Sequence, residues 1–595
     1  MHPDIPATGG IFEGFAIELA DADAKSHVSR ELSAIAGPDW AVRQFGDRHT
    51  DYELIQSKGR LSAQDGWNAA YALRALPGVA YAEPLFALSV FDNPKWVAGR
   101  GAATDSRDSA HLPESDSPEW SLDAIRVREA WQKFFPDSAK PPGHGVVIGH
   151  PDTGYQDHPE LDGRILGEAG YDFLHEDPDA HDDLERPLAE PIPNPGHGTG
   201  TASVIVSPGG GRRKYAGNGW VTGVAPGAQI IPLRTSYSVM LTSAGNLARA
   251  IEYAATHGAH VISISMGGLF SWRLRRAVMF AQQHGVIICA AAGNYAPFVG
   301  WPAAYDDVIA CAASNARGGT WRWGCRGQAV DVTAPGESVW RATVRKEEDG
   351  LKYDVSRGSG TSLATTCTAG VAAMWLSYHG RDALIVRYGK ENLPRVFQRV
   401  LRESCVKFPG WKEGKFGEGL VDAFRTLDAP LPDLVADGGT PSDRDADGHP
   451  KIDRGGLRTF AHLFDMSDGR SESAVEARDI AERDLRRALA ALLDTSQDEV
   501  PARLRETGPE LAFHLATDPS LYWSFATILE KWEKAARESS TVEDSNAVIA
   551  VNFEIEGLRQ SLSSRASAPL QSQLTGPRKA RVGLPGTSGS AAPHL

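Results

Sequence analysis

The stretch AGNLARAIEYAATHGAHVISIS, residues 244–265, has the pattern that predicts the fold of the central part of the chain. Its first part has apolar residues at helical spacing and closes at Gly258, a residue that commonly ends a helix. The apolar run that follows is short and is typical of a buried strand. A helix that leads directly into a buried strand predicts one unit of a parallel sheet covered by helices.

The same alternation continues on both sides of this stretch. Further apolar runs are GVVIGH, QIIPLR, GVIICAAAG and DVIACAA, and WRLRRAVMFAQQHG is a second helical pattern closed by glycine. We therefore predict an α/β domain over residues 119–430, with a parallel sheet and helices on both of its faces. In such folds ligands bind at the carboxyl ends of the strands, so residues directly after these runs are the candidates for a site.

Two smaller regions flank this domain. Residues 1–95 contain strand and helix patterns in the order βαββαβ, which predicts a small α+β domain, and the polar segment 96–118 reads as a linker. An acidic linker is expected over residues 431–455. Amphipathic patterns predict a mostly helical domain over 456–561, and the Ser-, Gly- and Pro-rich residues 562–595 read as a disordered tail.

Composition limits the class of protein. The 595 residues carry a formal net charge of −15, which disfavours nucleic acid as a partner. No apolar run approaches the roughly 20 residues that a membrane-spanning helix needs, and the first residues do not resemble a signal peptide. The expectation is therefore a cytoplasmic protein without a membrane partner. The five cysteines have no CxxC spacing, so they are expected to be reduced, packed thiols.

Three chemically capable residues stand beside predicted strand or helix ends. Asp152 ends the run GVVIGHPDTG, His197 lies in PNPGHGTGTA, and Ser362 lies in GSGTSLATTCTAG, all among small residues. A serine nucleophile needs a base to accept its proton, and an imidazole base needs a carboxylate that holds its tautomer. The surrounding glycines allow close approach of the backbone and leave these side chains accessible.

These motifs resemble the active-site signatures of the subtilisin-like serine peptidases, in that family's order Asp, His, Ser. DTG with HPEL at 158–161, GHGT and GTSLA carry the resemblance, and EWSLDAIRVREAW, GVAPGAQIIPLR, VISISMGG, AAAGN and VDVTAPG agree with it along about 300 residues. The resemblance implies a serine endopeptidase in which Ser362 attacks the peptide carbonyl, His197 moves the proton and Asp152 orients the imidazole. It also implies an oxyanion hole made by the Asn294 side chain and the Ser362 backbone N–H.

The resemblance further implies where a substrate would bind. An extended peptide is expected to pair with the strand that carries SISMGG. The residues expected to form the substrate site are Ser265, Met266, Gly267, Gly268, Gly293 and Gly300. Because none of them is acidic, we expect an apolar or aromatic residue before the cut rather than Lys or Arg.

The N-terminal domain acquires a role through the same resemblance, and the helical domain through its amphipathic patterns. The βαββαβ unit resembles the propeptide that chaperones and inhibits these enzymes, so a cut within 91–119 would release activity; an unrelated partner-binding domain is the alternative. The helical domain is expected to dock a regulator or a substrate. Two other functions stay open, a catalytically silent binding scaffold and a serine esterase.

Metals and nearby departures from the family pattern are the last sequence features. No cofactor or metal ligand is predicted; family members often bind structural calcium, but its ligands are not assignable on this chain. DRDADG at 443–448 opens like a calcium loop, but Arg454 stands where the bidentate Glu is required, which favours a plain linker. The acidic insert 175–190 is expected to attract basic residues of a substrate, bind a cation or be a solvated loop. Thr366 and Cys367 replace the family's usual proline and histidine, and we expect Cys367 to be packing rather than a second nucleophile.

Overall fold

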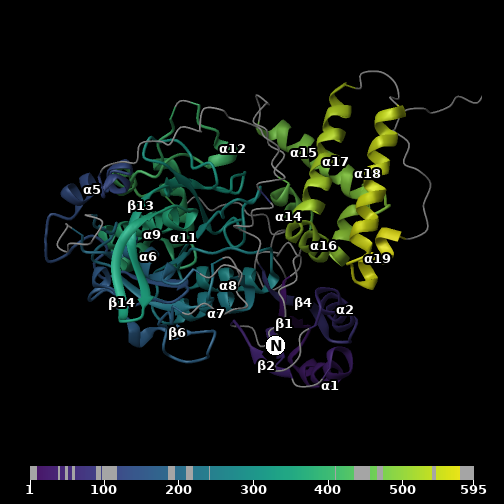
Figure 1. The fold of residues 1–595 in the computed structure, drawn as a ribbon, viewed down its shortest axis with the longest axis horizontal. Helices are drawn as coiled ribbons and strands as arrows, with labels where there is room; N and C mark the ends of the chain where they lie inside the picture. The colour runs from purple at the N-terminus through teal and green to yellow at the C-terminus, as the bar shows by residue number, and fades with distance from the viewer. Residues whose placement is uncertain are drawn as a thin grey trace, which may run out of the picture.

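The computed structural model describes most of the chain. The described residues are 10–37, 40–46, 51–56, 61–88, 96, 117–184, 194–209, 219–239, 242–408, 410–433, 456–464, 474–538 and 545–575. They form a central α/β domain, an N-terminal α+β domain and a C-terminal helical domain (Figure 1).

A parallel sheet of seven strands is the frame of the central domain, in the order β12-β11-β10-β9-β5-β7-β6. The strand pairs between these neighbours are all parallel. The strands are β5 (Val147–Asp152), β6 (Tyr171–Asp172), β7 (Gln229–Arg234), β9 (Val261–Ile264), β10 (Ile287–Ala291), β11 (Ile309–Ser314) and β12 (Val332–Pro335). The predicted α/β sheet is confirmed, and the stretch 244–265 forms helix α7 (Ala244–Thr256) followed by β9.

Helices cover both faces of this sheet because its strands are apolar on both sides. Val261 and Ile287 join the core on the side of α6 (His197–Val206) and α9 (Thr361–His379). Ile262 and Ile288 join the core on the side of α7 and α8 (Trp272–Gln283). The other elements of this domain are α4 (Trp120–Ala124), α5 (Val127–Phe134), η2 (Pro159–Leu161), η3 (Gly167–Ala169), β8 (Thr242–Ser243), the hairpin of β13 (Val339–Glu347) and β14 (Gly350–Gly358), α10 (Arg381–Tyr388), α11 (Leu393–Ser404), α12 (Glu413–Phe416) and α13 (Ala423–Asp428).

The N-terminal domain has the predicted βαββαβ order. It contains β1 (Ile11–Leu19), η1 (Ala22–Ala24), α1 (Lys25–Ala36), β2 (Trp40–Gln44), β3 (Asp51–Gln56), α2 (Ala63–Arg74) and β4 (Val79–Leu88). Helix α2 begins after Ser62, whose side chain accepts a hydrogen bond from the Asp65 backbone N–H, as a capping residue does. The antiparallel sheet of this domain gains a fifth strand, β8 of the central domain, which pairs with β4.

The C-terminal domain is a bundle of helices. It contains α14 (Leu457–Leu463), α15 (Ala474–Leu492), α16 (Val500–Thr517), α17 (Pro519–Glu538), α18 (Ser545–Ser563) and α19 (Ala568–Thr575). The prediction of a disordered tail from residue 562 is wrong for its first part, since α19 is helical and buries Leu570 and Leu574. The segment is rich in Ser, Gly and Pro, which is typical of disorder, but its two leucines are one helical turn apart and pack on the bundle. No helix in the described ranges has the length and apolar character required to cross a membrane.

The bundle lies against both other domains (Figure 1). One continuous apolar core includes residues of the N-terminal domain, the α7–α8 side of the sheet, and the bundle. Trp96, in the segment expected to be a linker, is buried in this core, with ring contacts to Phe298 of the central domain and Tyr522 of the bundle. Residue 96 is therefore held at the junction of the central domain and the bundle.

Candidate active site

The candidate residues come from strands that end, and from helices that begin, at one edge of the parallel sheet. Asp152 is the last residue of β5, and Ser265 follows the adjacent strand β9. His197 is the first residue of α6, and Ser362 is the second residue of α9. The carboxyl ends of parallel strands and the first turns of helices thus bring together residues up to 210 positions apart in sequence (Ser362 minus Asp152).

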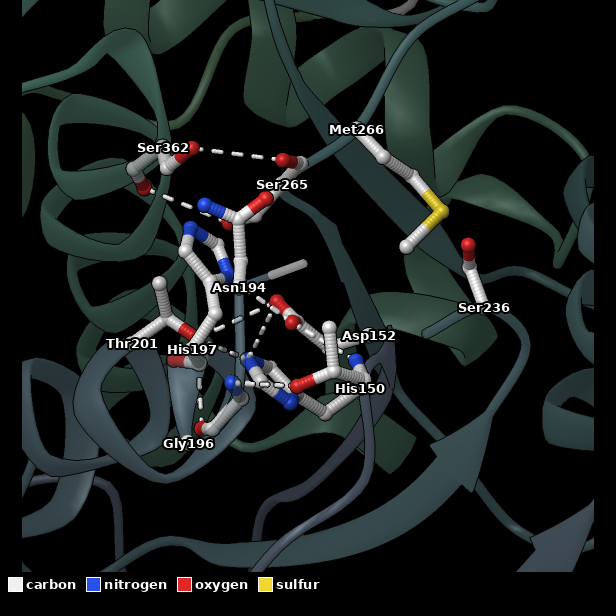
Figure 2. Close-up of polar contacts among 12 residues, drawn as sticks. His150, Asp152, Asn194, Gly196, His197, Thr201, Ser236, Ser265, Met266 and Ser362 are labelled. Carbon is white, nitrogen blue, oxygen red and sulfur yellow. Dashed lines mark hydrogen bonds and ion pairs between the residues drawn. The ribbon is translucent and has the colours of Figure 1, made fainter. Parts of the chain in front are cut away.

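Asp152 and His197 form a hydrogen-bonded pair. His197 Nδ1 lies 2.8 Å from Asp152 Oδ1, and the Thr153 backbone N–H donates to the same oxygen at 2.7 Å (Figure 2). The Asp152 carboxylate is fully buried, whereas 17% of the His197 side chain is exposed. Burial acts to raise the pKa of Asp152, but the charge and hydrogen bond of His197 outweigh it, and the pKa lies below its usual value. The pair is therefore an ionised carboxylate that orients an accessible imidazole.

Two glycines allow the helix that carries His197 to approach the loop after Asp152. A Cβ added to Gly198 would lie 2.0 Å from the Gly154 carbonyl oxygen, closer than any side chain tolerates. Gly196, directly before His197, has a φ of +75°, a left-handed conformation that glycine adopts without strain. The glycines of GHGT thus have a steric function at these positions.

Asp182 is a supporting residue that the sequence did not reveal. Its carboxylate accepts hydrogen bonds from Thr153 Oγ1 at 3.0 Å, the Gly196 N–H at 2.7 Å and the Leu184 N–H at 2.9 Å. Burial raises its pKa, which these donors oppose. Asp182 therefore ties the loop after Asp152 to the start of the helix that carries His197.

This finding also bears on the acidic insert 175–190, of which the structure describes residues up to Leu184. Several of its carboxylates have partners within the central domain. Asp183 pairs with Arg234 at 2.8 Å, and Glu176 pairs with Arg249 at 2.6 Å. In its described part the insert therefore contains buried, hydrogen-bonded carboxylates such as Asp182, together with exposed ones such as Asp179.

Ser362 lies beside Ser265, the residue that follows β9. Its Oγ donates to the Ser265 carbonyl oxygen at 3.2 Å, so in this conformation its proton points to β9 and not to His197 (Figure 2). The side chain is 7% exposed. Both Ser362 and its hydrogen-bond partner Ser265 belong to the predicted site.

Asn294 faces the same space as Ser362. Its Oδ1 accepts hydrogen bonds from the backbone N–H and the hydroxyl of Thr361, at 3.1 and 3.0 Å. Its amide nitrogen therefore points to the other side. A Cβ added to Gly360 would lie 3.6 Å from Asn294 Nδ2 and 3.9 Å from Ser362 Oγ, so both atoms lie on the same side of Gly360.

The predicted substrate residues have mixed surroundings. Gly268 forms an antiparallel bridge with Trp301, in which each N–H donates to the other carbonyl. Met266 is buried, and its sulfur accepts a hydrogen bond from Thr235 Oγ1 at 3.5 Å. Gly293 donates to Thr361 Oγ1, Gly300 donates to the Ala292 carbonyl, and Gly267 lies between Met266 and Gly268. The hydrogen bond from Gly293 to Thr361 connects the predicted substrate site directly to the segment that carries Ser362.

The predicted calcium-like stretch 443–448 lies outside the described residues. Within the part of the chain that the structure describes, no group of three or more His, Cys, Asp or Glu side chains could hold a metal ion. The five cysteines are free thiols, and burial raises the pKa of Cys367 to about 12. A thiol with that pKa is a poor nucleophile, which agrees with its expected packing role.

A parallel α/β sheet with a buried Asp–His pair and a serine at the start of a helix is typical of serine hydrolases. The family model described as the subtilase family matches residues 143–398. Thermitase from Thermoactinomyces vulgaris is 32% identical over 293 residues, which cover 47% of this chain and 89% of thermitase. The chain belongs to the subtilase family and is a serine-type endopeptidase.

A second relative extends beyond the catalytic domain. Fervidolysin from Fervidobacterium pennivorans is 29% identical over 395 residues, which cover 60% of this chain and 51% of fervidolysin. Its crystal structure, described as that of a keratinolytic enzyme related to subtilisin, matches with a TM-score of 0.51 at 23% identity. That match covers 72% of this chain and 64% of the other, and it supports the same fold.

Proposed function

We propose that Ser362, His197 and Asp152 hydrolyse peptide bonds through an acyl-enzyme intermediate. The observation that carries the proposal is the buried Asp152 carboxylate at 2.8 Å from His197 Nδ1, at the same sheet edge as Ser362. Because Asp152 holds Nδ1, the imidazole presents Nε2 as the base for the serine hydroxyl.

The reaction begins when the Ser362 hydroxyl turns from the Ser265 carbonyl toward His197. Ser362 Oγ attacks the substrate carbonyl while His197 accepts the hydroxyl proton, and Asp152 stabilises the imidazolium that forms. The imidazolium then donates its proton to the leaving amine. Water repeats the sequence on the acyl-enzyme, which restores Ser362.

Asn294 Nδ2 and the Ser362 backbone N–H are the proposed donors to the oxyanion. This role is supported by the bonds from Thr361 that turn the Asn294 oxygen away and leave its amide nitrogen beside Gly360. The oxyanion then lies at the first turn of α9, where backbone N–H groups favour negative charge. We expect Asn294→Ala to lower kcat by about 10²–10³-fold, the magnitude known for the asparagine of subtilisin, with a smaller effect on KM.

The proposed substrates are proteins or peptides with an apolar or aromatic residue before the cut. Ser265, Met266, Gly267, Gly268, Gly293 and Gly300 are the proposed substrate-binding residues. The Gly268 backbone already pairs with Trp301, so the substrate strand would have to use the neighbouring backbone groups. Cleavage of a peptide library, read by mass spectrometry, tests this preference.

We propose that the N-terminal domain inhibits the enzyme until it is removed. Support comes from the pairing of β4 with β8, in which Ala87 faces Ser243 and Leu88 faces Thr242. Leu88 is the last residue of β4, so this strand ends at its pairing with the central domain. Inhibition by the intact domain and release by a cut in 91–119 remain predictions.

The bundle has a proposed partner inside the chain. Phe513 of α16 has ring contacts with Phe86 and Trp67 of the N-terminal domain, at centroid distances of 4.8 and 6.1 Å. The Gln64 side chain donates to the Ala566 carbonyl at 2.7 Å, and the Ala568 N–H donates to Asn68 Oδ1 at 2.8 Å. We propose that the bundle retains the N-terminal domain, so a protein regulator would act by displacing it.

The decisive experiment compares the wild-type chain with Ser362→Ala and with Ser377→Ala, a control on the same helix, whose hydroxyl donates to the His144 carbonyl. A fluorophosphonate probe measures serine labelling, and casein measures proteolysis. We expect labelling and cleavage with the wild type and the control but not with Ser362→Ala. Equal behaviour of all three would refute the catalytic assignment, and labelling without casein cleavage in fully processed protein would indicate an esterase.

Mass spectrometry of the same samples tests the zymogen proposal. We expect a Ser362-dependent cut within 91–119 that precedes casein cleavage. Full activity of the uncut chain would contradict inhibition by the N-terminal domain.

A cytoplasmic location remains a prediction. It is supported by five free cysteines, four of them buried, since reduced thiols are usual in reducing compartments. Detection of the protein in the culture medium of intact cells would contradict it.

A further inference from the structure

A second histidine lies beside the proposed relay. His150 belongs to β5, two residues before Asp152, and its side chain is 3% exposed. Its Nε2 lies 3.1 Å from Thr201 Oγ1 and 4.0 Å from Asp152 Oδ2 (Figure 2). The mechanism described above gives this buried histidine no role.

Thr201 connects His150 to the carboxylate. Its Oγ1 lies 3.2 Å from Asp152 Oδ2, 3.0 Å from the His197 carbonyl oxygen and 3.2 Å from the Gly198 carbonyl oxygen. A hydroxyl has one proton to donate, so it can serve one of these three acceptors fully. The ionised carboxylate is the strongest acceptor among them.

The protonation state of His150 decides which way this chain of bonds runs. Burial lowers the pKa of His150; among the charged groups that face it, Asp152 on its own strand opposes this shift and His197 on α6 adds to it. The imidazole is therefore neutral at neutral pH. A neutral imidazole with its proton on Nε2 donates to Thr201 Oγ1, whereas the opposite tautomer would take the Thr201 proton for itself.

We propose that His150 is a positioning residue of the relay: its Nε2–H donates to Thr201 Oγ1 and thereby directs the single Thr201 proton onto Asp152 Oδ2. Both oxygens of the carboxylate are then held, Oδ1 by His197 and the Thr153 N–H, and Oδ2 by Thr201. This inference rests on the proposed function of the same site.

Loss of the His150 donor should affect turnover more than substrate binding. The Thr201 hydroxyl would then distribute its proton among the carboxylate and the two carbonyls, and Asp152 would lose part of its support. One hydrogen bond has a net value of about 0.5–1.5 kcal/mol, which converts to a fall in kcat of about 2- to 12-fold with KM unchanged. A less supported carboxylate also makes protonation of the relay easier, so the acid limb of kcat/KM should move to higher pH.

The test uses the processed wild-type enzyme, His150→Leu, His150→Gln and the double variant His150→Leu/Thr201→Val. Gln offers a neutral N–H near the position of Nε2 but does not titrate. Ser203→Ala is the control, since its hydroxyl is buried on the same helix and bonds to the Gly200 carbonyl and the Ala342 N–H. Active sites are counted with the fluorophosphonate probe, and kcat, KM, the pH profile and the unfolding midpoint are measured.

We expect His150→Leu to lower kcat and shift the acid limb, and His150→Gln to restore both toward wild type. The double variant replaces both polar partners, so its unfolding midpoint should recover while its kcat stays low. Recovery of kcat together with stability in the double variant would show a purely structural pair and overturn the proposal, as would a wild-type kcat and pH profile in His150→Leu. If the wild type itself neither labels nor cleaves, the proposed function fails instead.

Discussion

The N-terminal domain contacts the rest of the molecule through two faces of different chemistry. Toward the catalytic domain it presents buried carboxylates to the start of α8, beside ring contacts of Phe45 and Tyr81 with Trp272. Toward the bundle it presents aromatic rings to α16, beside hydrogen bonds between neutral groups. Both faces are buried. The contact with α8 requires one orientation of the N-terminal domain, whereas the contact with α16 mainly buries apolar surface.

The face toward the catalytic domain depends on hydrogen-bond direction. Glu83 accepts from Ser271 Oγ at 2.7 Å and from the Trp272 and Arg273 backbone N–H groups at 3.1 Å each. The Arg273 side chain bonds Glu53 at 2.5 Å and is fully buried. A carboxylate at a helix N-terminus meets otherwise unpaired N–H groups, so a small rotation of the domain would lose these bonds.

The face toward the bundle depends on area and shape. Phe513, 5% exposed, packs against both Phe86 and Trp67, which also contact each other. Such contacts tolerate small shifts but contribute a large part of the stability, since burial of an aromatic side chain removes much apolar surface from water. We therefore expect the contact with the bundle to contribute most of the stability of the N-terminal domain in its docked position. The contact with the catalytic domain is expected to determine the orientation of the N-terminal domain.

The largest expected effect comes from Phe513→Ala in the Ser362→Ala chain, which we expect to be inactive. Loss of the ring leaves a cavity between two aromatic side chains and should cost about 3–5 kcal/mol of local stability. Hydrogen exchange of the N-terminal strands, read by mass spectrometry, should accelerate by at least about 100-fold. Phe553→Ala, which changes a ring that is 82% exposed on α18, is the matched control and should change little.

A smaller effect is expected for Glu83→Ala in the same background. The variant leaves three donors at the start of α8 without their acceptor, and because water can fill part of the space we expect a cost of about 2 kcal/mol. Exchange should accelerate in both β4 and the first turn of α8. Asp23→Ala, an exposed acidic residue of the same domain, is the control. A larger effect for Glu83→Ala than for Phe513→Ala would reverse the comparison.

The pH dependence of the polar face gives a third test. Burial raises the pKa of Glu83 above 4.5 despite its donors, so the folded protein binds this proton more tightly than the unfolded chain. Its contribution to stability is therefore greatest below pH 4.5 and declines as pH rises through the folded-state pKa. Glu83→Gln should remove this decline from the thermal midpoints measured between pH 4 and 8. If the thermal midpoint of Glu83→Gln declined with pH as steeply as that of the parent chain, the decline would not come from Glu83.

The smallest effect is expected for Arg43→Ala. Arg43 of β2 pairs with Glu176 of the catalytic domain at 3.5 Å, and both side chains are at least 40% exposed. Solvent screens such a pair, so the change in stability should be below about 0.5 kcal/mol and should shrink further in 0.5 M salt. A loss of stability comparable to that of Glu83→Ala would mean that exposed charges also determine the orientation of the N-terminal domain.

Much of the fold was predictable because its signals are local. The helix and strand of 244–265 have the periodicity of α7 and β9, and the order of patterns in residues 1–95 is that of the N-terminal domain. The residues Asp152, His197 and Ser362 were found through motifs whose small neighbours have a steric purpose, as Gly198 shows.

Other features were not predictable because their partners are distant in sequence. Asp182 lies within an acidic insert, where nothing distinguishes it from Asp179 or Asp183, yet it alone joins Thr153 to Gly196. Helix α19 was mistaken for disorder because Ser, Gln and Pro surround its two buried leucines. Nor does any local pattern indicate that Glu83 would meet the N-terminus of α8.

Local patterns in the sequence were sufficient to predict the class of fold, the family and the residues proposed for the chemistry, because the alternation of apolar residues and the short motifs involve only neighbours along the chain. Only packing places His150 beside Thr201 and Asp152, and only packing brings the N-terminal domain between the start of α8, which donates to Glu83, and the Phe513 ring of α16. These features arise from contacts between segments brought together only by packing, and such contacts leave no period or spacing in the sequence.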